Sequence, residues 1–224
     1  MIYLFTNEIF GRFFIETIHR FALQFNLKVT VVYSTKGNLY NFKSTNPFKS
    51  LIRRLAMTFK KYSFRKNTGF ALEVIGDINS PAFADRIKME DHGIVAGFNQ
   101  IFKKETISRF HSLVNFHPSL LPFYRGPVPA YWCLHYGERS TGLTLHKITD
   151  RIDSGEILFQ EVLSIGEIND PMELEKKIAE SAQPIFWKYL QHVSGNEDRW
   201  QTQILDAFTI YKNQIDYLSF PPRG

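Results

Sequence analysis

An α/β fold with a mostly parallel, twisted sheet flanked by helices is the architecture that this sequence predicts. The chain opens with a strand, helix and strand pattern, which is how a parallel sheet covered by helices begins. Residues 93–98 form an uninterrupted apolar run, as expected of a central parallel strand. A long amphipathic helical pattern over residues 171–189 would close the domain. Together these features indicate a Rossmann-like fold.

Two sequence patterns predict the opening unit: apolar and β-branched runs predict its strands, and apolar residues at helical spacing predict its helix. Residues 2–6 are a short apolar run, and residues 27–33 contain a β-branched run, so both are predicted strands. Residues 8–25 carry apolar side chains at helical spacing: Phe10, Phe14, Ile18, Phe21 and Phe25. Gly11 stands alone between the first strand and Phe14, so a glycine-rich phosphate-binding loop is not predicted here.

A basic segment follows this unit. Residues 34–45 read as a loop, and Asn46-Pro47 begins a predicted helix with one apolar face. Eleven Lys or Arg and no Asp or Glu lie between Thr17 and Leu72, within a chain of net charge +5. The basic stretch 36–66 is therefore either a solvated outer face or a surface for a diphosphate, a nucleic acid or an anionic membrane.

The middle of the chain continues the alternation of strands and helices. Residues 72–76 and 93–98 are predicted strands. Residues 80–89 are a predicted helix that starts at Ser80-Pro81, and residues 104–110 are a second, short helix.

The last third alternates as well. Residues 112–114 read as the end of a buried strand, and residues 141–149 and 156–165 as two further strands. Residues 127–136 are a predicted helix with Trp132 and Leu134 inward. The helical segment 171–189 is expected to kink or break near Pro184. We expect one domain over residues 1–192 and a short C-terminal extension, 193–224, whose aromatic tail after Ile204 could form a homodimer contact.

The composition narrows the class of protein. Apolar residues make up 44% of the chain, which is typical of a globular protein. The single Cys133 excludes an intramolecular disulfide and fits a reducing compartment. The spacing of Cys and His predicts no metal site, and no apolar run reaches membrane-spanning length. We expect a cytoplasmic protein.

The clearest chemical signal is at the end of the strand that begins at Ser112. Asn115 and His117 are two residues apart, so the period of a strand points both side chains to the same side. Pro118 and Pro122 stiffen the loop that follows, and Asp153 lies in a short loop further along the chain. An amide, an imidazole and a carboxylate can polarise a carbonyl and manage a proton, which indicates an enzyme.

These residues lie in longer motifs. Asn115-Phe-His-Pro-Ser-Leu-Leu-Pro122 with Tyr124-Arg-Gly126, followed by Asp150-Arg-Ile-Asp-Ser-Gly155, resembles the formyltransferases that use 10-formyltetrahydrofolate. That family includes glycinamide ribonucleotide formyltransferase, methionyl-tRNA formyltransferase and the N-formyltransferases of nucleotide-linked amino sugars. The resemblance is densest over residues 93–160 and extends more weakly over residues 1–192.

The resemblance implies a formyltransferase fold and a set of site residues. It gives Asn115, His117 and Asp153 the catalytic roles, with 10-formyltetrahydrofolate as formyl donor. The residues that it places near the donor are Asn99, Gln100, Ile101, Phe102, His146, Thr149 and Asp150. Those that it places near the acceptor are Ser119, Tyr124, Arg125 and Gly126. His146 could instead pack between sheet and helix, Arg125 could anchor the loop, and Ser119 could be a turn former.

The acceptor follows by elimination within the family. The segment after the first strand differs from the glycine-rich phosphate loop of the glycinamide ribonucleotide enzymes, and too few residues follow Tyr189 for an RNA-binding domain, so nucleic acid is an unlikely partner. A regulatory domain of the formyltetrahydrofolate hydrolase type does not precede the motif. A nucleotide-linked amino deoxysugar, as used in surface polysaccharide (O-antigen) biosynthesis, is the expected acceptor, and the basic stretch 36–66 could meet its diphosphate. Formyl transfer to glycinamide ribonucleotide and a non-catalytic anion-binding protein remain the alternatives.

Overall fold

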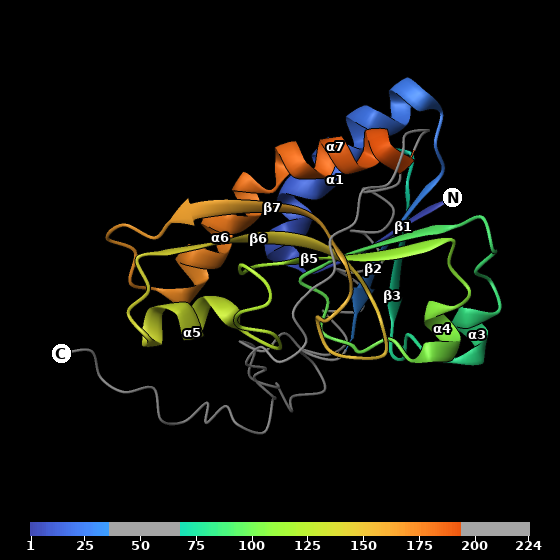
Figure 1. Ribbon diagram of the computed structural model, residues 1–224. Helices are drawn as coiled ribbons and strands as arrows, with labels where there is room; N and C mark the ends of the chain where they lie inside the picture. Colours follow the sequence, from blue (N-terminus) through green and yellow to red (C-terminus); the bar gives the residue numbers. More distant parts are fainter. Residues whose placement is uncertain (36–67, 194–224) are drawn as a thin grey trace, which may run out of the picture.

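A seven-stranded sheet forms the centre of the molecule (Figure 1). The computed structural model describes residues 1–35 and 68–193 of the chain. The strand order is β3-β2-β1-β4-β5-β6-β7. The strands are β1 (Ile2–Thr6), β2 (Val29–Ser34), β3 (Ala71–Ile75), β4 (His92–Ala96), β5 (Ser112–His117), β6 (Ser140–Lys147) and β7 (Ile157–Ser164).

The sheet is mostly parallel, as the sequence predicts. Strands β1 to β5 pair in parallel, whereas β6 pairs antiparallel with both β5 and β7. The direction in which successive strands are added to the sheet reverses at β1, since β2 and β3 lie on one side of it and β4 on the other. In open α/β sheets ligands bind outside the carboxyl ends of strands near such a reversal. The predicted α/β architecture is confirmed.

Helix α1 (Glu8–Phe25) has the bounds that its apolar spacing predicts. It starts because the Asn7 side chain accepts hydrogen bonds from the backbone N–H groups of Ile9 and Phe10. It ends at Asn26, whose φ of 51° is left-handed. Phe25 is 43% exposed, so the buried face stops one turn before the predicted end of the stripe.

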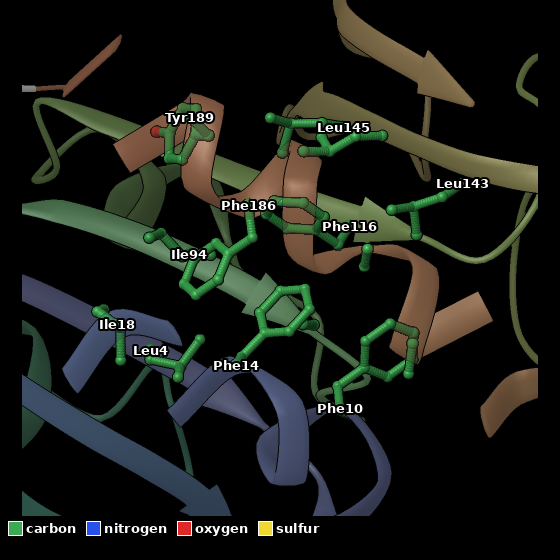
Figure 2. Close-up of a cluster of buried hydrophobic side chains, with 14 of the residues drawn as sticks. Leu4, Phe10, Phe14, Ile18, Ile94, Phe116, Leu143, Leu145, Phe186 and Tyr189 are labelled. Atoms are coloured by element: carbon green, nitrogen blue, oxygen red, sulfur yellow. The ribbon is translucent and has the colours of Figure 1, made fainter. Parts of the chain in front are cut away.

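One face of the sheet is covered by α1 together with α6 (Pro171–Ser181) and α7 (Gln183–Val193) (Figure 1). Figure 2 shows the interior of this layer, where Phe14 and Phe116 lie against Phe186. The rings of Phe14 and Phe186 stack with centroids 4.2 Å apart. The predicted break near Pro184 is confirmed, since α6 ends at Ser181 and α7 begins two residues later.

A second, smaller core lies on the other face of the sheet. It contains Tyr3 and Phe5 of β1 and is covered by α3 (Pro81–Ala84) and α4 (Lys104–Ile107). Phe83 and Phe102 meet the Phe5 ring edge-on, with centroids 6.0 and 5.1 Å away. Both faces of β1 are thus buried, which accounts for its uninterrupted apolar sequence.

Three predicted helices are shorter in the structure than in the sequence analysis. The helix predicted over residues 80–89 is α3, and the one over 104–110 is α4, each four residues long. After α3 the chain turns with tighter hydrogen bonds, such as Arg86 N–H to the Phe83 carbonyl, and the Asp91 carboxylate then accepts the Lys88 N–H. Local side-chain and turn bonds have replaced the helical pattern.

The third is α5 (Pro129–His135), and its phase differs from the prediction. Val128 precedes it with a left-handed φ of 51°, so the helix starts two residues later than expected. Its buried residues are Pro129, Ala130 and Cys133, whereas Trp132 is only partly buried. The inward placement of Trp132 was wrong; Leu134 does pack against the main core.

Some expectations fall outside the described residues. These are the helix that begins at Asn46, the anionic partner of the stretch 36–66, and the dimer contact after Ile204. The division into a domain of residues 1–192 and an extension of residues 193–224 stays a prediction as well. Within the part of the chain that the structure describes, none of the helices is long and apolar enough to cross a membrane.

Candidate active site

A cleft of about 510 Å³ lies at the carboxyl ends of the parallel strands. It is lined by the residues that follow β1, β4 and β5, by the start of α5, by the loop between β6 and β7, and by α6. The predicted residues on its wall are Asn99, Gln100, Ile101, Phe102, Asn115, His117, Gly126, His146, Thr149, Asp150 and Asp153. Residues spread over about a quarter of the chain, from Asn99 to Asp153, therefore converge on one site.

Asn115 and His117 reach the cleft from β5. Phe116 between them is fully buried in the main core, so the alternation of the strand turns the two polar side chains to the other side. Asn115 stands directly opposite His146 of β6 in the antiparallel register. This pairing brings His146 beside the amide, because opposite residues on adjacent strands are close neighbours.

Asp153 is held by the loop between β6 and β7. Its backbone is left-handed, with φ of 45°, which a non-glycine residue adopts only when its surroundings enforce it. Gly155 closes this loop: a Cβ there would lie 1.9 Å from the Lys147 carbonyl oxygen, so only glycine fits. The Gly126 N–H donates to Asp153 Oδ2 at 2.8 Å. Two glycines of the predicted motifs thus fix the carboxylate.

The Asn115 amide lies between His146 and Asp153. Its Nδ2 is 3.2 Å from His146 Nε2 and 3.4 Å from Asp153 Oδ1. His146 Nδ1 is 2.8 Å from the Lys147 carbonyl oxygen, which can only accept, so Nδ1 carries a proton. In the neutral ring Nε2 then accepts from Asn115, and the amide is oriented with its N–H groups toward the carboxylate. These bonds are long, so a substrate oxygen can compete for the same N–H groups.

Both nitrogens of His117 face acceptors. Nε2 donates to the Tyr124 carbonyl oxygen at 2.9 Å, and Nδ1 lies 3.4 Å from Asp153 Oδ2. A neutral imidazole can satisfy one of these acceptors, whereas an imidazolium satisfies both. His117 is therefore placed to take up a proton and hold it.

The charges of the site are set by burial and by one carboxylate. Burial lowers the pKa of His117 below its ordinary value, although Asp153 and the Tyr124 carbonyl oppose this. Burial alone would raise the pKa of Asp153, but His117, His146 and the Gly126 N–H outweigh it and hold that pKa well below its usual range. At neutral pH the site thus contains a carboxylate and a neutral His117 that can act as a base.

The loop after β5 supports the site more than it lines it. Ser119 is fully buried, and its Oγ donates to the Phe123 carbonyl. The Tyr124 hydroxyl donates to Glu138, and the Arg125 side chain is buried. Of the four residues expected to contact the acceptor, Gly126 lines the cleft and these three build the loop. For Ser119, the turn-forming alternative describes the geometry.

The residues expected near the donor form the other wall. Gln100 is fixed by two bonds: its Oε1 accepts from Ile78 N–H at 3.0 Å and its Nε2 donates to Ser34 Oγ at 2.6 Å. Phe102 is buried, whereas Ile101 is 72% exposed and its carbonyl accepts from Asn79. Thr149 Oγ1 bonds within the loop between β6 and β7, to Arg151 and Ser154, so it shapes the backbone of that loop.

The polar residues of the cleft that the sequence analysis does not single out include Asn7 and Glu175. Their side chains hydrogen-bond to each other. The sequence offers a weak signal for Asn7, because Asn is a favoured N-cap, and none for the pairing.

The site combines an amide donor, a base and a carboxylate at the open end of an α/β sheet. This arrangement defines an enzyme that transfers an acyl-type group, because it can stabilise an oxyanion and move a proton. The model of one family, described as Formyl transferase, matches residues 24–190. The chain belongs to the formyl transferase family, as the motifs predicted.

Individual relatives span several branches of this family. Methionyl-tRNA formyltransferase of Pseudothermotoga lettingae is 34% identical over 112 residues, which are 50% of this chain and 37% of that protein. This chain thus covers just over a third of that relative. The crystal structure of WlaRD, a sugar 3N-formyl transferase in the presence of dTDP and 5-N-formyl-THF, is similar with a TM-score of 0.70 and 18% identity, covering 96% of this chain and 70% of that one. Glycinamide ribonucleotide transformylase 1 of Symbiobacterium toebii is similar with a TM-score of 0.65 and 18% identity. The similarity covers 92% of this chain and 93% of that one.

Proposed function

We propose that this protein transfers the formyl group of 10-formyltetrahydrofolate to the amine of a nucleotide-linked amino deoxysugar, in the cytoplasm. The observation that carries the proposal is the convergence of Asn115, His117 and Asp153 in one cleft. The likeness to a sugar 3N-formyl transferase with dTDP and 5-N-formyl-THF supports the choice of donor and acceptor. Such a product would serve the synthesis of surface polysaccharides such as O-antigen.

The chemistry assigns one task to each of the three residues. When an amine attacks a formyl group, the carbonyl oxygen becomes negative and the amine must lose a proton. Asn115 can donate an N–H to that oxygen when a substrate displaces its long bonds to Asp153 and His146. His117 takes the proton, since the imidazolium satisfies both the Tyr124 carbonyl and the Asp153 carboxylate. It then returns a proton to N10 of the folate as the bond between N10 and the formyl carbon breaks and the oxyanion becomes the carbonyl of the formamide product. Asp153 stays ionised and stabilises the imidazolium that forms.

The cleft has two sides on which the donor and the acceptor can lie. Asn99 to Phe102 and the loop residues 148–152 form one side, next to the smaller core. We assign this side to the pterin of the donor, which backbone groups of Thr149 and Asp150 and the apolar Ile148 would contact. The other side consists of the start of α1, the start of α5 and α6, and it is left for the acceptor.

Glycinamide ribonucleotide is the second candidate acceptor. The observation in its favour is the similarity in fold to the Symbiobacterium toebii enzyme, whose TM-score of 0.65 is close to the 0.70 of the sugar enzyme. Against it stands the segment Asn7-Glu-Ile-Phe-Gly11, which begins α1 directly and places a Glu rather than a glycine-rich loop beside the cleft.

The test is release of tetrahydrofolate from 10-formyltetrahydrofolate in the presence of a panel of acceptors. The panel contains 3-amino and 4-amino deoxysugars on thymidine, uridine and guanosine diphosphates, together with glycinamide ribonucleotide. We expect turnover with at least one amino sugar. Turnover with glycinamide ribonucleotide alone would reject the sugar acceptor and keep the formyl transfer. If none of the acceptors in the panel is turned over, both the sugar acceptor and the formyl transfer are rejected.

A further inference from the structure

Glu175 and Asn7 form a polar pair on the acceptor side of the cleft that the proposed transfer chemistry does not use. Glu175 lies in the first half of α6, is partly buried, and lines the cleft together with Met172 one turn before it. Asn7 lies between β1 and α1. A buried carboxyl group beside an active site needs a partner, and Asn7 supplies only part of what it can bind.

The orientation of Asn7 is fixed by its other contacts. Its Oδ1 accepts from Ile9 N at 3.0 Å and from Phe10 N at 2.9 Å, so Nδ2 is the group that can donate to Glu175. Gly97 lies directly against that amide, since a Cβ there would be 2.4 Å from Asn7 Nδ2. The Asn7 amide is thus held between the start of α1 and the end of β4, and it holds the carboxyl group of Glu175 at the cleft wall.

The sheet register gives the separation between this pair and the catalytic residues. Thr6 pairs with Ala96 and Ala96 with Phe116, so Asn7, Gly97 and His117 stand side by side at the ends of three adjacent strands. Adjacent strands are about 4.8 Å apart, which puts the backbone of Asn7, two strands away, about 10 Å from that of His117. A sugar ring with a hydrogen bond on each side fits in this space. When the acceptor amine meets Asn115 and His117, Glu175 therefore faces a different substituent of the same ring.

The chemistry of Glu175 suits a neutral hydroxyl group. Burial raises the pKa of Glu175 to about 7, against the opposing effect of the hydrogen bond from Asn7. The carboxylate accepts from a hydroxyl group and the carboxylic acid donates to one, so both forms bind it. The neighbouring wall is apolar, with Val128, Ala130 and Met172, and an anionic group there would meet a partly charged Glu175.

We propose that Glu175, held by Asn7, is a specificity-determining residue that hydrogen-bonds to a hydroxyl group of the acceptor sugar next to its amine-bearing carbon. This inference rests on the proposed function, because it takes the acceptor to be an amino sugar. It adds a contact that selects among amino sugars by the hydroxyl groups that they carry.

The test compares two proteins and two acceptors. Glu175→Gln keeps the shape and can still accept from Asn7, but it cannot ionise. The acceptors are the nucleotide-linked amino sugar that the wild type uses and its deoxy analogue without the hydroxyl group next to the amine. At pH 8, where the carboxylate predominates, its hydrogen bond contributes about 1.5–3 kcal/mol and that of the neutral amide about 0.5–1.5 kcal/mol, so the variant should raise KM for the hydroxylated acceptor by about 5–10-fold. For the deoxy analogue, wild type and variant should have the same KM.

The controls separate this contact from general damage. Glu180→Gln changes an exposed residue of the same helix and should leave both KM values unchanged. Binding of 5-formyltetrahydrofolate to Glu175→Gln, followed by fluorescence, should match the wild type. If Glu175→Gln does not fold, the wild type alone still tests the contact, since it should prefer the hydroxylated acceptor by at least about 10-fold.

Two results would overturn the inference while the proposed function stands: an unchanged KM of the variant for the hydroxylated acceptor, or an equal increase for both acceptors. A wild type that turns over none of the amino sugars would instead overturn the proposed function, and the inference with it.

Discussion

Histidines cluster at both ends of the same sheet, and the two clusters differ in what surrounds them. At the carboxyl end, His117 and His146 lie beside Asp153, with ring centroids 6.2 Å apart. At the amino end, His92 of β4 lies against His111, with centroids 5.0 Å apart. Burial lowers the pKa of both His117 and His92. Burial and residue type therefore do not distinguish His117, which we propose to be catalytic, from His92.

The difference lies in the partners of the ring nitrogens. His117 faces a carboxylate and a carbonyl, so each of its nitrogens has an acceptor that favours the protonated ring. His92 Nδ1 instead meets the hydroxyl group of Ser112 at 2.8 Å, and that hydroxyl group bonds to Tyr189 at 3.1 Å. A hydroxyl group donates as readily as it accepts, so Nδ1 of a neutral His92 has a partner in either tautomer. We therefore expect His117 to exchange a proton and His92 to remain neutral.

Replacing His117 should give the largest effect on activity. In His117→Ala the base is lost and the Asp153 carboxylate loses its partner, so we expect kcat to fall by about 10³–10⁴-fold. The matched variant His92→Ala, at the other end of the sheet, should keep kcat within about threefold, since its ring lies outside the cleft. Tetrahydrofolate release gives the rates, and circular dichroism verifies the fold. Equal losses in the two variants would show that the carboxyl-end cluster is not the catalytic one.

Replacing Asn115 should cost less, because a single donor is removed. Asn115→Ala leaves His117 and Asp153 in place and is expected to lower kcat by about 10²–10³-fold, the usual effect of losing one oxyanion donor. Since Asn115 acts mainly on the developing oxyanion, KM for the donor should stay within about threefold. An increase in KM with an unchanged kcat would assign Asn115 to substrate binding instead.

Asp153→Asn should have a smaller effect on rate and a distinctive effect on pH dependence. The carboxylate raises the pKa of His117 against burial, so its removal lets that pKa fall further. The acid limb of kcat/KM should then move to lower pH, while the maximal rate falls by about 10²-fold because the imidazolium is less stabilised. The profile is measured from pH 5 to 9 with the acceptor below KM. An acid limb that moves to higher pH would contradict this electrostatic role.

The sequence predicted those parts of the molecule that depend on local patterns. The bounds of β1 and α1 agree residue for residue, because one is a short apolar run and the other has an N-cap and a clean helical spacing. The common side of Asn115 and His117 follows from strand alternation alone. The place of Asp153 beside them came only from the resemblance, since the left-handed loop that holds it cannot be read from spacing.

The parts that were missed depend on contacts between distant segments. The phase of α5 was wrong because its start is set by the unusual backbone of Val128. For Ser119 and Arg125 the alternatives, a turn former and a loop anchor, describe the buried side chains, whereas only a contact between distant residues places Tyr124 against Glu138. Glu175 meets Asn7 only because α6 packs across the start of α1. The secondary-structure propensities of residues carry no information about contacts between such distant segments.

The smallest expected effect concerns His92 and stability rather than activity. Burial lowers the pKa of His92 to about 4, and His111, His192 and the N-terminus add to this while Asp91 opposes it. A histidine whose pKa is lowered by folding stabilises the protein fully above its unfolded pKa of about 6.5, and this stabilisation is lost as the pH falls toward 4. Since the ring is only partly buried, the loss should be about 1–3 kcal/mol.

His92→Gln isolates this contribution. Gln can still bond to Ser112 Oγ but does not titrate, so the variant should lose about 1–3 kcal/mol less stability than the wild type between pH 7 and pH 4. Urea unfolding at both pH values, followed by circular dichroism, measures the difference. The exposed His135 gives the control, because it is not among the groups that shift the pKa of His92, so His135→Gln should change the pH dependence by less than about 0.5 kcal/mol. Equal pH dependence of wild type and His92→Gln would mean that His92 takes up its proton without strain, and the contrast between the two ends of the sheet would then rest on the cleft alone.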